Sequence, residues 1–435
     1  MLKEKKILIF PSGTEIAHEI YRSLRYEKNI ELIGGSSISS HGDEIFSTSY
    51  NDIPFCHEKE FAPKINKIIK QHKIDFIFPA HDEALLHLSR NIASINAKII
   101  SSTPRVCEIT RFKSKTYDAL NSLEICPKLY ALDESIEEWP IFSKPDQGQG
   151  SQGIAIIESQ KDFESHTIKN PNHIYCEYLP GEEITVDCFT DRHGSLLYSN
   201  GRTRSLTRNG ISIKSHSLDS ESEDSKIENI ARKILSRIPL RGVWFFQLKK
   251  DRHNQWKLLE IASRVSGTMG LNRAKGVNLP LMALYDAENI DITVLGHNKP
   301  VHVSRYLGSL YQIDIEYDTV YLDYDDTLIW NEQINPTLIS FVAQARAKQK
   351  KVILLTRHQG NLVDSLKQYG LTPDFFDEVH HITDGKPKSF FIKNLSSIFI
   401  DDSFSERKEV YDATNIPCFS LESVETLFNW KTFLS

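Results

Sequence analysis

The stretch FSKPDQGQGSQGI, residues 142–154, decides how the N-terminal part of the chain is interpreted. It joins two apolar runs, Pro140–Ser143 and Ile154–Glu158, which have the composition of short strands. Glycines let a backbone approach an anion closely, and consecutive amides can then surround phosphate oxygens. Lys144, just before the glycines, adds a cation for the same phosphates. A plain hairpin connection is the commoner explanation of such a loop, and no Gly-Lys-Ser/Thr closes it as in a Walker loop.

Strand and helix patterns alternate before this loop. Thr14 is placed to cap a helix, and residues 62–73 have helical spacing of apolar side chains. This rhythm predicts a parallel sheet covered by helices, an α/β domain over residues 1–104. Its expected strands are Lys6–Phe10, Ile30–Ile33, Asp75–Pro79 and Lys98–Ser101.

The pattern changes after residue 104 and again near residue 310. Residues 105–310 combine helices with strands in the manner of an antiparallel α+β domain, and residues 311–435 return to the α/β rhythm. Helices are expected over Arg111–Leu123 and Ser225–Ile238. The expected strands are His173–Tyr178, Glu183–Thr190, Leu196–Ser199, Val243–Lys249, Trp256–Ile261, Thr319–Leu322, Val352–Leu355 and Ser397–Ile400.

Bulk properties restrict the class of protein. The chain has 435 residues, which predicts two to four domains, and a formal net charge of -6. That charge argues against nucleic acid or an anionic membrane as the main partner. No apolar run has the length of a signal peptide or a membrane span, and the six cysteines lack a Cys-x-x-Cys pair. We therefore expect a cytoplasmic protein with buried thiols that acts on small molecules. The oligomeric state stays open, with a homo-oligomer allowed.

Two later motifs give the glycine-rich loop a context. They are YCEYLPGEE at residues 175–183 and LLEIASRVSG at residues 258–267. In this order and spacing the set resembles the ATP-grasp superfamily, specifically its carbamoyl-phosphate-synthetase-like carboxylate–amine ligase branch, over about residues 5–300. The resemblance implies ATP as the nucleotide and Mg²⁺ or Mn²⁺ as the metal.

The resemblance also implies roles for individual residues. Lys144 and Lys115 would contact the ATP phosphates, with Lys113 the alternative to Lys115, and Arg264 would face the transferred phosphoryl group. The flap would comprise Gly148, Gly150, Ser151 and Gly153; the adenine hinge Glu177, Tyr178 and Leu179; the ribose contact Glu182 or Glu183; and the metal ligands Glu260 and Gln247.

One position departs from the family pattern. The last motif commonly reads Glu-x-Asn-x-Arg, and here Ala262 stands in the middle, where it cannot coordinate a metal. The main hypothesis is a ligase that forms an acyl phosphate and releases ADP. Two alternatives remain: a kinase that transfers phosphoryl without joining an amine, and an ATP-binding module that regulates another activity. Two interpretations of the basic run Gly201–Asn209 stay open: a clamp for an acidic substrate or acyl phosphate, and a solvated loop.

A second constellation lies near the C-terminus. In VYLDYDDTL, residues 320–328, a buried strand ends in Asp323-x-Asp325. Carboxylates two residues apart at a strand exit can share a metal, the first attacking phosphorus and the second acting as acid and base. Downstream follow a strand that ends in Thr356, a helix expected to start at Lys386, and a strand that ends in Asp401 and Asp402.

Together these residues resemble the four motifs of haloacid-dehalogenase-type phosphatases, over about residues 318–435. The resemblance implies that Asp323 is the nucleophile and Asp325 the acid and base. Thr356 and Lys386 would hold the phosphoryl group, with Lys388 the alternative lysine. Asp323, Asp325, Asp401 and Asp402 would form the Mg²⁺ site. The gaps between motifs leave no room for a cap domain, so we expect an open, Rossmann-like phosphatase domain that acts on a metabolite related to the ligase reaction.

Overall fold

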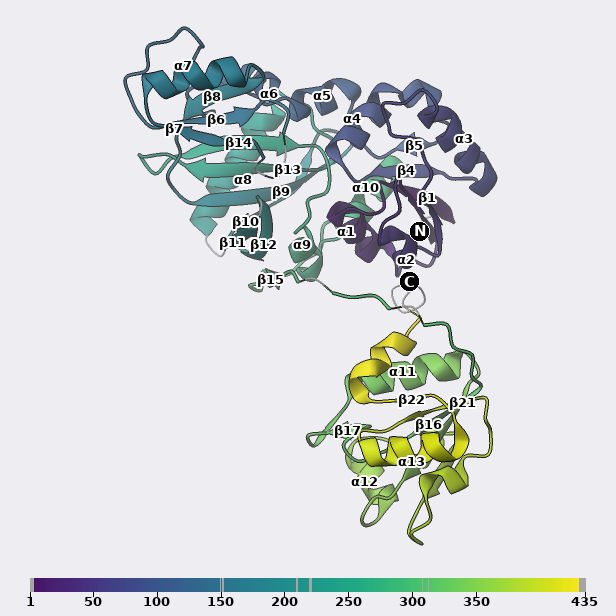
Figure 1. Ribbon diagram of the computed structural model, residues 1–435. Coiled ribbons are helices and arrows are strands. Elements are labelled where there is room, and N and C mark those ends of the chain that lie inside the picture. Colours follow the sequence, from purple (N-terminus) through teal and green to yellow (C-terminus); the bar gives the residue numbers. More distant parts are fainter. Residues whose placement is uncertain are drawn as a thin grey trace. The chain divides into compact units, whose positions relative to one another are not determined.

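The computed structural model describes residues 4–148, 150, 152–208, 210–218, 221–306, 308–311 and 313–429. The chain forms two compact units, Met1–Leu307 and Gly308–Leu434 (Figure 1). The division between them falls close to the change of pattern expected near residue 310. No helix in these ranges is long and apolar enough to cross a bilayer.

The first unit opens with a five-stranded sheet in the order β3-β2-β1-β4-β5, in which every pairing is parallel. Ile7, Leu8 and Ile9 are all fully buried, so both faces of the central strand are covered. The parallel sheet expected from the alternating pattern is therefore confirmed. Its strands are β1 (Lys5–Phe10), β2 (Ile30–Gly35), β3 (Thr48–Tyr50), β4 (Phe76–Pro79) and β5 (Lys98–Ile99), and its helices α1 (Glu15–Leu24), α2 (Gly42–Ile45), α3 (Phe61–His72) and α4 (Asp82–Arg90).

Antiparallel sheets follow in the same unit. A three-stranded sheet, β7-β6-β8, packs against α7, and a four-stranded sheet, β10-β9-β13-β14, packs against α8. A small sheet, β11-β12-β15, completes this part. The bounds are β6 (Ile141–Pro145), β7 (Ala155–Ile157), β8 (His173–Glu177), β9 (Glu183–Thr190), β10 (Leu196–Thr203), β11 (Leu206–Arg208), β12 (Ile211–His216), β13 (Gly242–Lys250), β14 (Trp256–Ala262), β15 (His302–Ser304), α7 (Gln160–Lys169), α8 (Glu221–Leu235), α9 (Gly270–Ala274) and α10 (Leu279–Ala287).

The helix expected over residues 111–123 begins two residues later in the structure and ends in a 3-10 turn. It comprises α6 (Lys113–Leu120) and η2 (Asn121–Leu123), and a separate helix, α5 (Pro104–Arg111), precedes it with extended backbone at Phe112 between the two. The Asp146 carboxylate accepts from the Ser114 amide at 2.7 Å and from the Ser114 hydroxyl at 2.8 Å. The cap of α6 thus comes from the glycine-rich loop, which local apolar spacing cannot reveal.

The second unit is a five-stranded sheet in the order β20-β19-β16-β21-β22, again parallel throughout. The carboxyl ends of β16 and β21 are neighbours, because Leu322 lies in register with Ile400. The helix expected at Lys386 is instead a short 3-10 turn, η4 (Lys388–Phe391). The elements are β16 (Thr319–Leu322), β17 (Ile329–Trp330), β18 (Gln333–Ile334), β19 (Lys351–Thr356), β20 (Glu378–His381), β21 (Ser397–Ile400), β22 (Cys418–Phe419), α11 (Pro336–Ala347), α12 (Leu362–Gln368), η3 (Pro373–Phe375), α13 (Phe404–Thr414) and η5 (Leu421–Leu427).

Candidate functional site

A cavity of about 210 Å³ lies in the first unit among strands β6, β8, β9, β13 and β14. Residues far apart in the sequence meet here. The candidates that line the cavity are Lys144, Gly148, Gly150, Glu177, Tyr178, Leu179, Glu183, Gln247 and Glu260.

Lys144 is a buried cation at the wall of this cavity. Its Nζ donates to the Tyr117 hydroxyl at 2.7 Å and to the Leu259 carbonyl at 3.0 Å. Within the described part of the chain, no carboxylate lies at ion-pair distance from it. Burial lowers the pKa of Lys144, since removal from water disfavours the ammonium form. An anion in the cavity would compensate this charge.

The glycine-rich loop is fixed beside Lys144. Gly150 and Gly153 have φ of 63° and 71°, conformations that favour glycine. A Cβ at Gly153 would lie 3.0 Å from the Pro145 side chain. The Gly148 carbonyl accepts from Lys113 Nζ at 3.2 Å, which ties the loop to α6. Gly153 lines a neighbouring hollow rather than the main cavity. Ser151 lies outside the described residues.

Two side chains with oxygen atoms line the cavity from neighbouring strands. Gln247 on β13 and Glu260 on β14 are register partners, and both line the cavity. A carboxylate and an amide oxygen suit the Mg²⁺ of a bound nucleotide, which keeps most of its other ligands as phosphate oxygens and water. Ala262, two residues further along β14, is buried opposite Phe245 and offers no ligand.

Glu182 and Glu183, the two expected ribose ligands, differ in position. Glu183 lines the cavity and pairs with Arg204 at 2.7 Å, whereas Glu182 lies outside it and pairs with Lys250 at 3.2 Å. The basic run also divides. Arg204 lines the cavity, while Arg202 is buried in an ion pair with Asp187 at 2.8 Å. Strand alternation does not separate these two arginines, because residues two apart share a face; Arg204 lies just beyond Thr203, where β10 ends.

Lys115 is not part of the cavity. It forms an ion pair with Glu108, and its side chain is 47% exposed. Lys113, the alternative lysine, lines the cavity instead. The separation follows from the division at Phe112, since α6 starts at Lys113 and the two lysines leave its first turn in different directions.

Arg264 also differs from its expected place. It does not line the cavity, and its guanidinium makes two 2.7 Å hydrogen bonds to the Asp82 carboxylate in the first turn of α4. Burial opposes ionisation of Asp82, yet the Arg264 charge holds the pKa of Asp82 below its usual value. The structure therefore ties this arginine to the parallel-sheet domain rather than to the glycine-rich loop.

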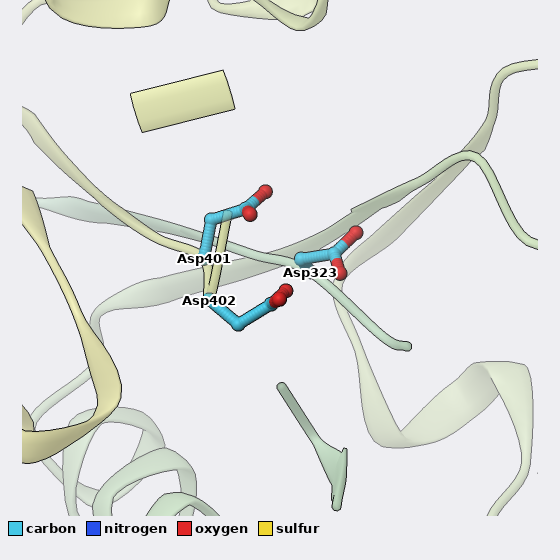
Figure 2. Close-up of side chains that lie close together, drawn as sticks. All are labelled: Asp323, Asp401 and Asp402. Carbon is cyan, nitrogen blue, oxygen red and sulfur yellow. The ribbon is translucent and has the colours of Figure 1, made fainter. Parts of the chain in front are cut away.

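The second unit holds a cluster of carboxylates at the ends of β16 and β21. Asp323, Asp401 and Asp402 each place an oxygen within 4.8 Å of the others, and Figure 2 shows the three side chains together. Asp323 and Asp401 are 5% and 1% exposed. The Lys388 ammonium donates to both of them at 2.6 Å. Lys388 contacts two of the three carboxylates, and the Arg407 guanidinium donates to the backbone carbonyls of Asp401 and Asp402. A divalent cation fits the carboxylate charge that Lys388 leaves.

Lys388, and not Lys386, contacts this carboxylate cluster. Lys386 pairs with Asp384 at 2.8 Å and is half exposed, whereas the Lys388 side chain is 3% exposed. Pro387 between them has extended backbone, so the lysine that follows it turns into the cluster. Thr356, also expected here, is fully buried at the end of β19.

Asp325 lies apart from the carboxylate cluster. Its carboxylate is 50% exposed and accepts from His358 Nδ1 at 2.8 Å. Within the described ranges, the group that offers three metal ligands consists of Asp323, Asp401 and Asp402 without Asp325. The Asp325 side chain, which was expected to bind the metal, is thus not part of this group. Sequence reasoning missed His358, whose one signal is its position just after the β19 threonine.

Burial raises the pKa of Asp323 to about 7, with Lys388 opposing the shift and Asp401 adding to it. The folded state therefore holds a proton that the unfolded state, with a carboxyl pKa near 3.8, has lost. In EDTA, we expect the unfolding free energy to fall as pH rises between these two values, by up to about 1.4 kcal/mol per pH unit.

The Asp323→Asn variant should lack this slope, because its amide does not titrate. Urea denaturation of the full chain at about pH 5 and about pH 8 measures the difference. A stability difference between variant and wild type that is the same at both pH values would contradict the assignment.

Comparisons with known proteins concern the first unit. The profile of the family described as "ATP-grasp in the biosynthetic pathway with Ter operon" matches residues 169–307. A biotin carboxylase from Campylobacter jejuni, in complex with beta-gamma-ATP, is similar in structure, with a TM-score of 0.56 and 18% identity over 67% of this chain and 72% of that one. No curated protein sequence matches the chain.

Two further solved structures are similar. An L-amino acid ligase from Bacillus licheniformis has a TM-score of 0.54 and 14% identity, over 66% of this chain and 75% of that one. An N5-carboxyaminoimidazole synthetase from Staphylococcus aureus, complexed with ADP, has a TM-score of 0.57 and 13% identity, over 71% of this chain and 83% of that one. At such identities the likeness shows the fold. Profile and fold together show that the chain contains an ATP-grasp domain.

Proposed function

We propose that the unit Met1–Leu307 is an ADP-forming ligase that joins a carboxylate to an amine. The observation that carries this proposal is the buried Lys144 ammonium, which has no carboxylate partner among the described residues and faces a cavity lined by Gln247 and Glu260. This arrangement suits the phosphates of MgATP. The likeness to an L-amino acid ligase and a carboxyaminoimidazole synthetase favours acid activation over other uses of ATP.

The chemistry has two steps. A substrate carboxylate oxygen attacks the γ-phosphorus, and the bond from that phosphorus to the β-phosphate oxygen breaks. The products of this step are an acyl phosphate and ADP. The amine nitrogen then attacks the acyl carbon, phosphate leaves with the bonding pair, and the nitrogen loses a proton. Lys144 and Lys113 would balance charge on the phosphates, and Gln247 and Glu260 would hold the Mg²⁺ of the nucleotide.

A second candidate is an ATP-binding module that regulates the rest of the chain without turning ATP over. Two observations favour it: Ala262 removes a metal ligand, and Arg264 is tied to Asp82 rather than lining the nucleotide cavity. This candidate predicts ATP binding without ADP formation.

MgATP incubated with pooled carboxylic acids, with pooled amines and with both separates these functions. The ligase forms more than one equivalent of ADP per enzyme only when acid and amine are present together. ADP formed without an amine, with a stable phosphorylated product, identifies a kinase. ATP binding measured by calorimetry, with no ADP from any pool, identifies the regulatory module.

We propose that the unit Gly308–Leu434 is a haloacid-dehalogenase-type phosphatase that acts on a phosphorylated small molecule. The bridge from Lys388 to Asp323 and Asp401, at adjacent ends of parallel strands, carries this proposal. Asp323 would attack phosphorus, and Asp401 and Asp402 would hold a Mg²⁺ with it. When bound, that ion would draw charge from the phosphoryl oxygens.

Two lysines on α6 give a matched test of the nucleotide cavity. Lys113→Ala should raise the KM for ATP about 10-fold or more, because a charge-assisted contact to phosphate is lost. Lys115→Ala should stay within about 2-fold of wild type, because Lys115 pairs with Glu108 at the surface. Steady-state kinetics decides between them, and a larger effect at Lys115 would restore the assignment made from the sequence.

A further inference from the structure

His358 connects two of the residues assigned to the phosphatase reaction. It lies between β19 and α12, and its Nδ1 is 2.8 Å and 3.1 Å from the two oxygens of the Asp325 carboxylate. Its backbone amide donates to the Thr356 hydroxyl at 3.1 Å. One residue thus contacts both the expected acid and base and the expected phosphoryl-binding threonine.

The imidazole of His358 is itself held on several sides. Nε2 lies 2.7 Å from the Ser365 hydroxyl on α12, and the ring meets Tyr324 edge to face at 5.0 Å. The His358 carbonyl accepts from His381 Nε2 at 2.8 Å. The His358 side chain is 15% exposed, against 50% for Asp325. A fixed ring therefore meets a carboxylate that solvent would otherwise leave free to rotate.

We infer that His358 is a positioning residue that orients the Asp325 carboxyl group for proton transfer. The inference rests on the phosphatase function proposed above. Nδ1 lies 2.8 Å from one Asp325 oxygen and 3.1 Å from the other, which fixes the plane of the carboxyl group, and Ser365 donates to the opposite ring nitrogen. Such support of a reacting group by a packed, hydrogen-bonded neighbour preserves its alignment.

The step that depends on this alignment is cleavage of the phosphate ester. An Asp323 oxygen bonds to phosphorus, the bond from phosphorus to the leaving oxygen breaks, and the Asp325 proton passes to that oxygen. Water then bonds to phosphorus, gives its proton to Asp325, and the bond between Asp323 and phosphorus breaks to release phosphate. A poor leaving group needs the first proton, whereas a good one leaves as the anion.

Substituted phenyl phosphates test the inference, because they vary the leaving group at nearly constant shape. For His358→Ala we expect kcat/KM to fall about 100-fold or more with phenyl phosphate and about 10-fold or less with p-nitrophenyl phosphate, with KM little changed. His358→Asn keeps a donor near the Nδ1 position and should recover most of the activity. Ser365→Ala should show a smaller loss with the same dependence on leaving group.

His380→Ala is the matched control, since His380 pairs with Glu378 on β20 and contacts neither Asp325 nor Thr356 in the described structure. Equal losses on both esters in His358→Ala and Ser365→Ala would reduce His358 to a structural role and overturn the inference. The inference would also be overturned if both variants kept the activity of the wild type. A wild-type protein that hydrolyses none of the esters with Mg²⁺ would refute the phosphatase function itself, which separates the two failures.

Discussion

Lys144→Met should reduce ATP turnover about 1000-fold while leaving the protein as stable as wild type, or more stable. The wild-type ammonium is buried against Tyr117 and Leu259 with its pKa lowered by burial, and no carboxylate among the described residues pairs with it. Methionine fills a similar volume without that charge. The Leu259 carbonyl keeps a donor, because the Tyr117 hydroxyl also bonds to it at 2.8 Å.

An assay of ADP formation and urea denaturation of the full chain measure the two effects, and calorimetric titration with MgATP measures the affinity. Lys169→Met, at the exposed end of α7, is the control and should change neither quantity. Loss of stability that matches the loss of binding would indicate that Lys144 is structural. Unchanged ATP affinity would place the phosphates elsewhere.

Lys388→Met should destabilise the protein, in contrast to Lys144→Met. It should reduce phosphate-ester hydrolysis about as strongly as Lys144→Met reduces ATP turnover. Lys388 is the cation that compensates the buried carboxylates of Asp323 and Asp401, and both bonds are 2.6 Å. Removing one partner of a buried ion pair costs about 3–5 kcal/mol. We expect a loss of this size at neutral pH in EDTA, and a hydrolysis rate lowered at least about 1000-fold.

Lys386→Met provides the matched control two residues away. Its half-exposed pair with Asp384 is worth little, so hydrolysis and stability should stay near wild type. The double variant Asp323→Asn/Lys388→Met should regain part of the lost stability, because one uncompensated carboxylate is removed. Equal effects of the two lysine variants, or a stable Lys388→Met protein, would contradict the cluster as described.

The parallel sheets were predictable because their strands are buried on both faces. Runs such as Val320–Leu322 and Ile7–Ile9 are apolar throughout, and turn residues bound them. The positions of Asp323 and Asp401 follow from the same logic, since adjacent parallel strands end at one edge.

The side-chain partners that come from distant parts of the chain were not predictable. Arg264 meets Asp82 across 182 positions, and the cap of α6 comes from Asp146 in the glycine-rich loop. The choice of Lys388 over Lys386 depends on the direction in which the chain leaves Pro387. Sequence spacing did not distinguish these two lysines, because they are two residues apart and either could reach the carboxylates.

Phosphorus NMR on the wild-type protein and two variants tests most directly whether each unit has its own site for phosphoryl chemistry. Wild type, Lys144→Met and Asp323→Asn would each receive MgATP with pooled acids and amines and, separately, phenyl phosphate esters. We predict that Lys144→Met loses ADP formation and keeps ester hydrolysis, and that Asp323→Asn does the reverse. Loss of both activities in either variant, or ADP formation that survives Lys144→Met, would contradict two separate sites.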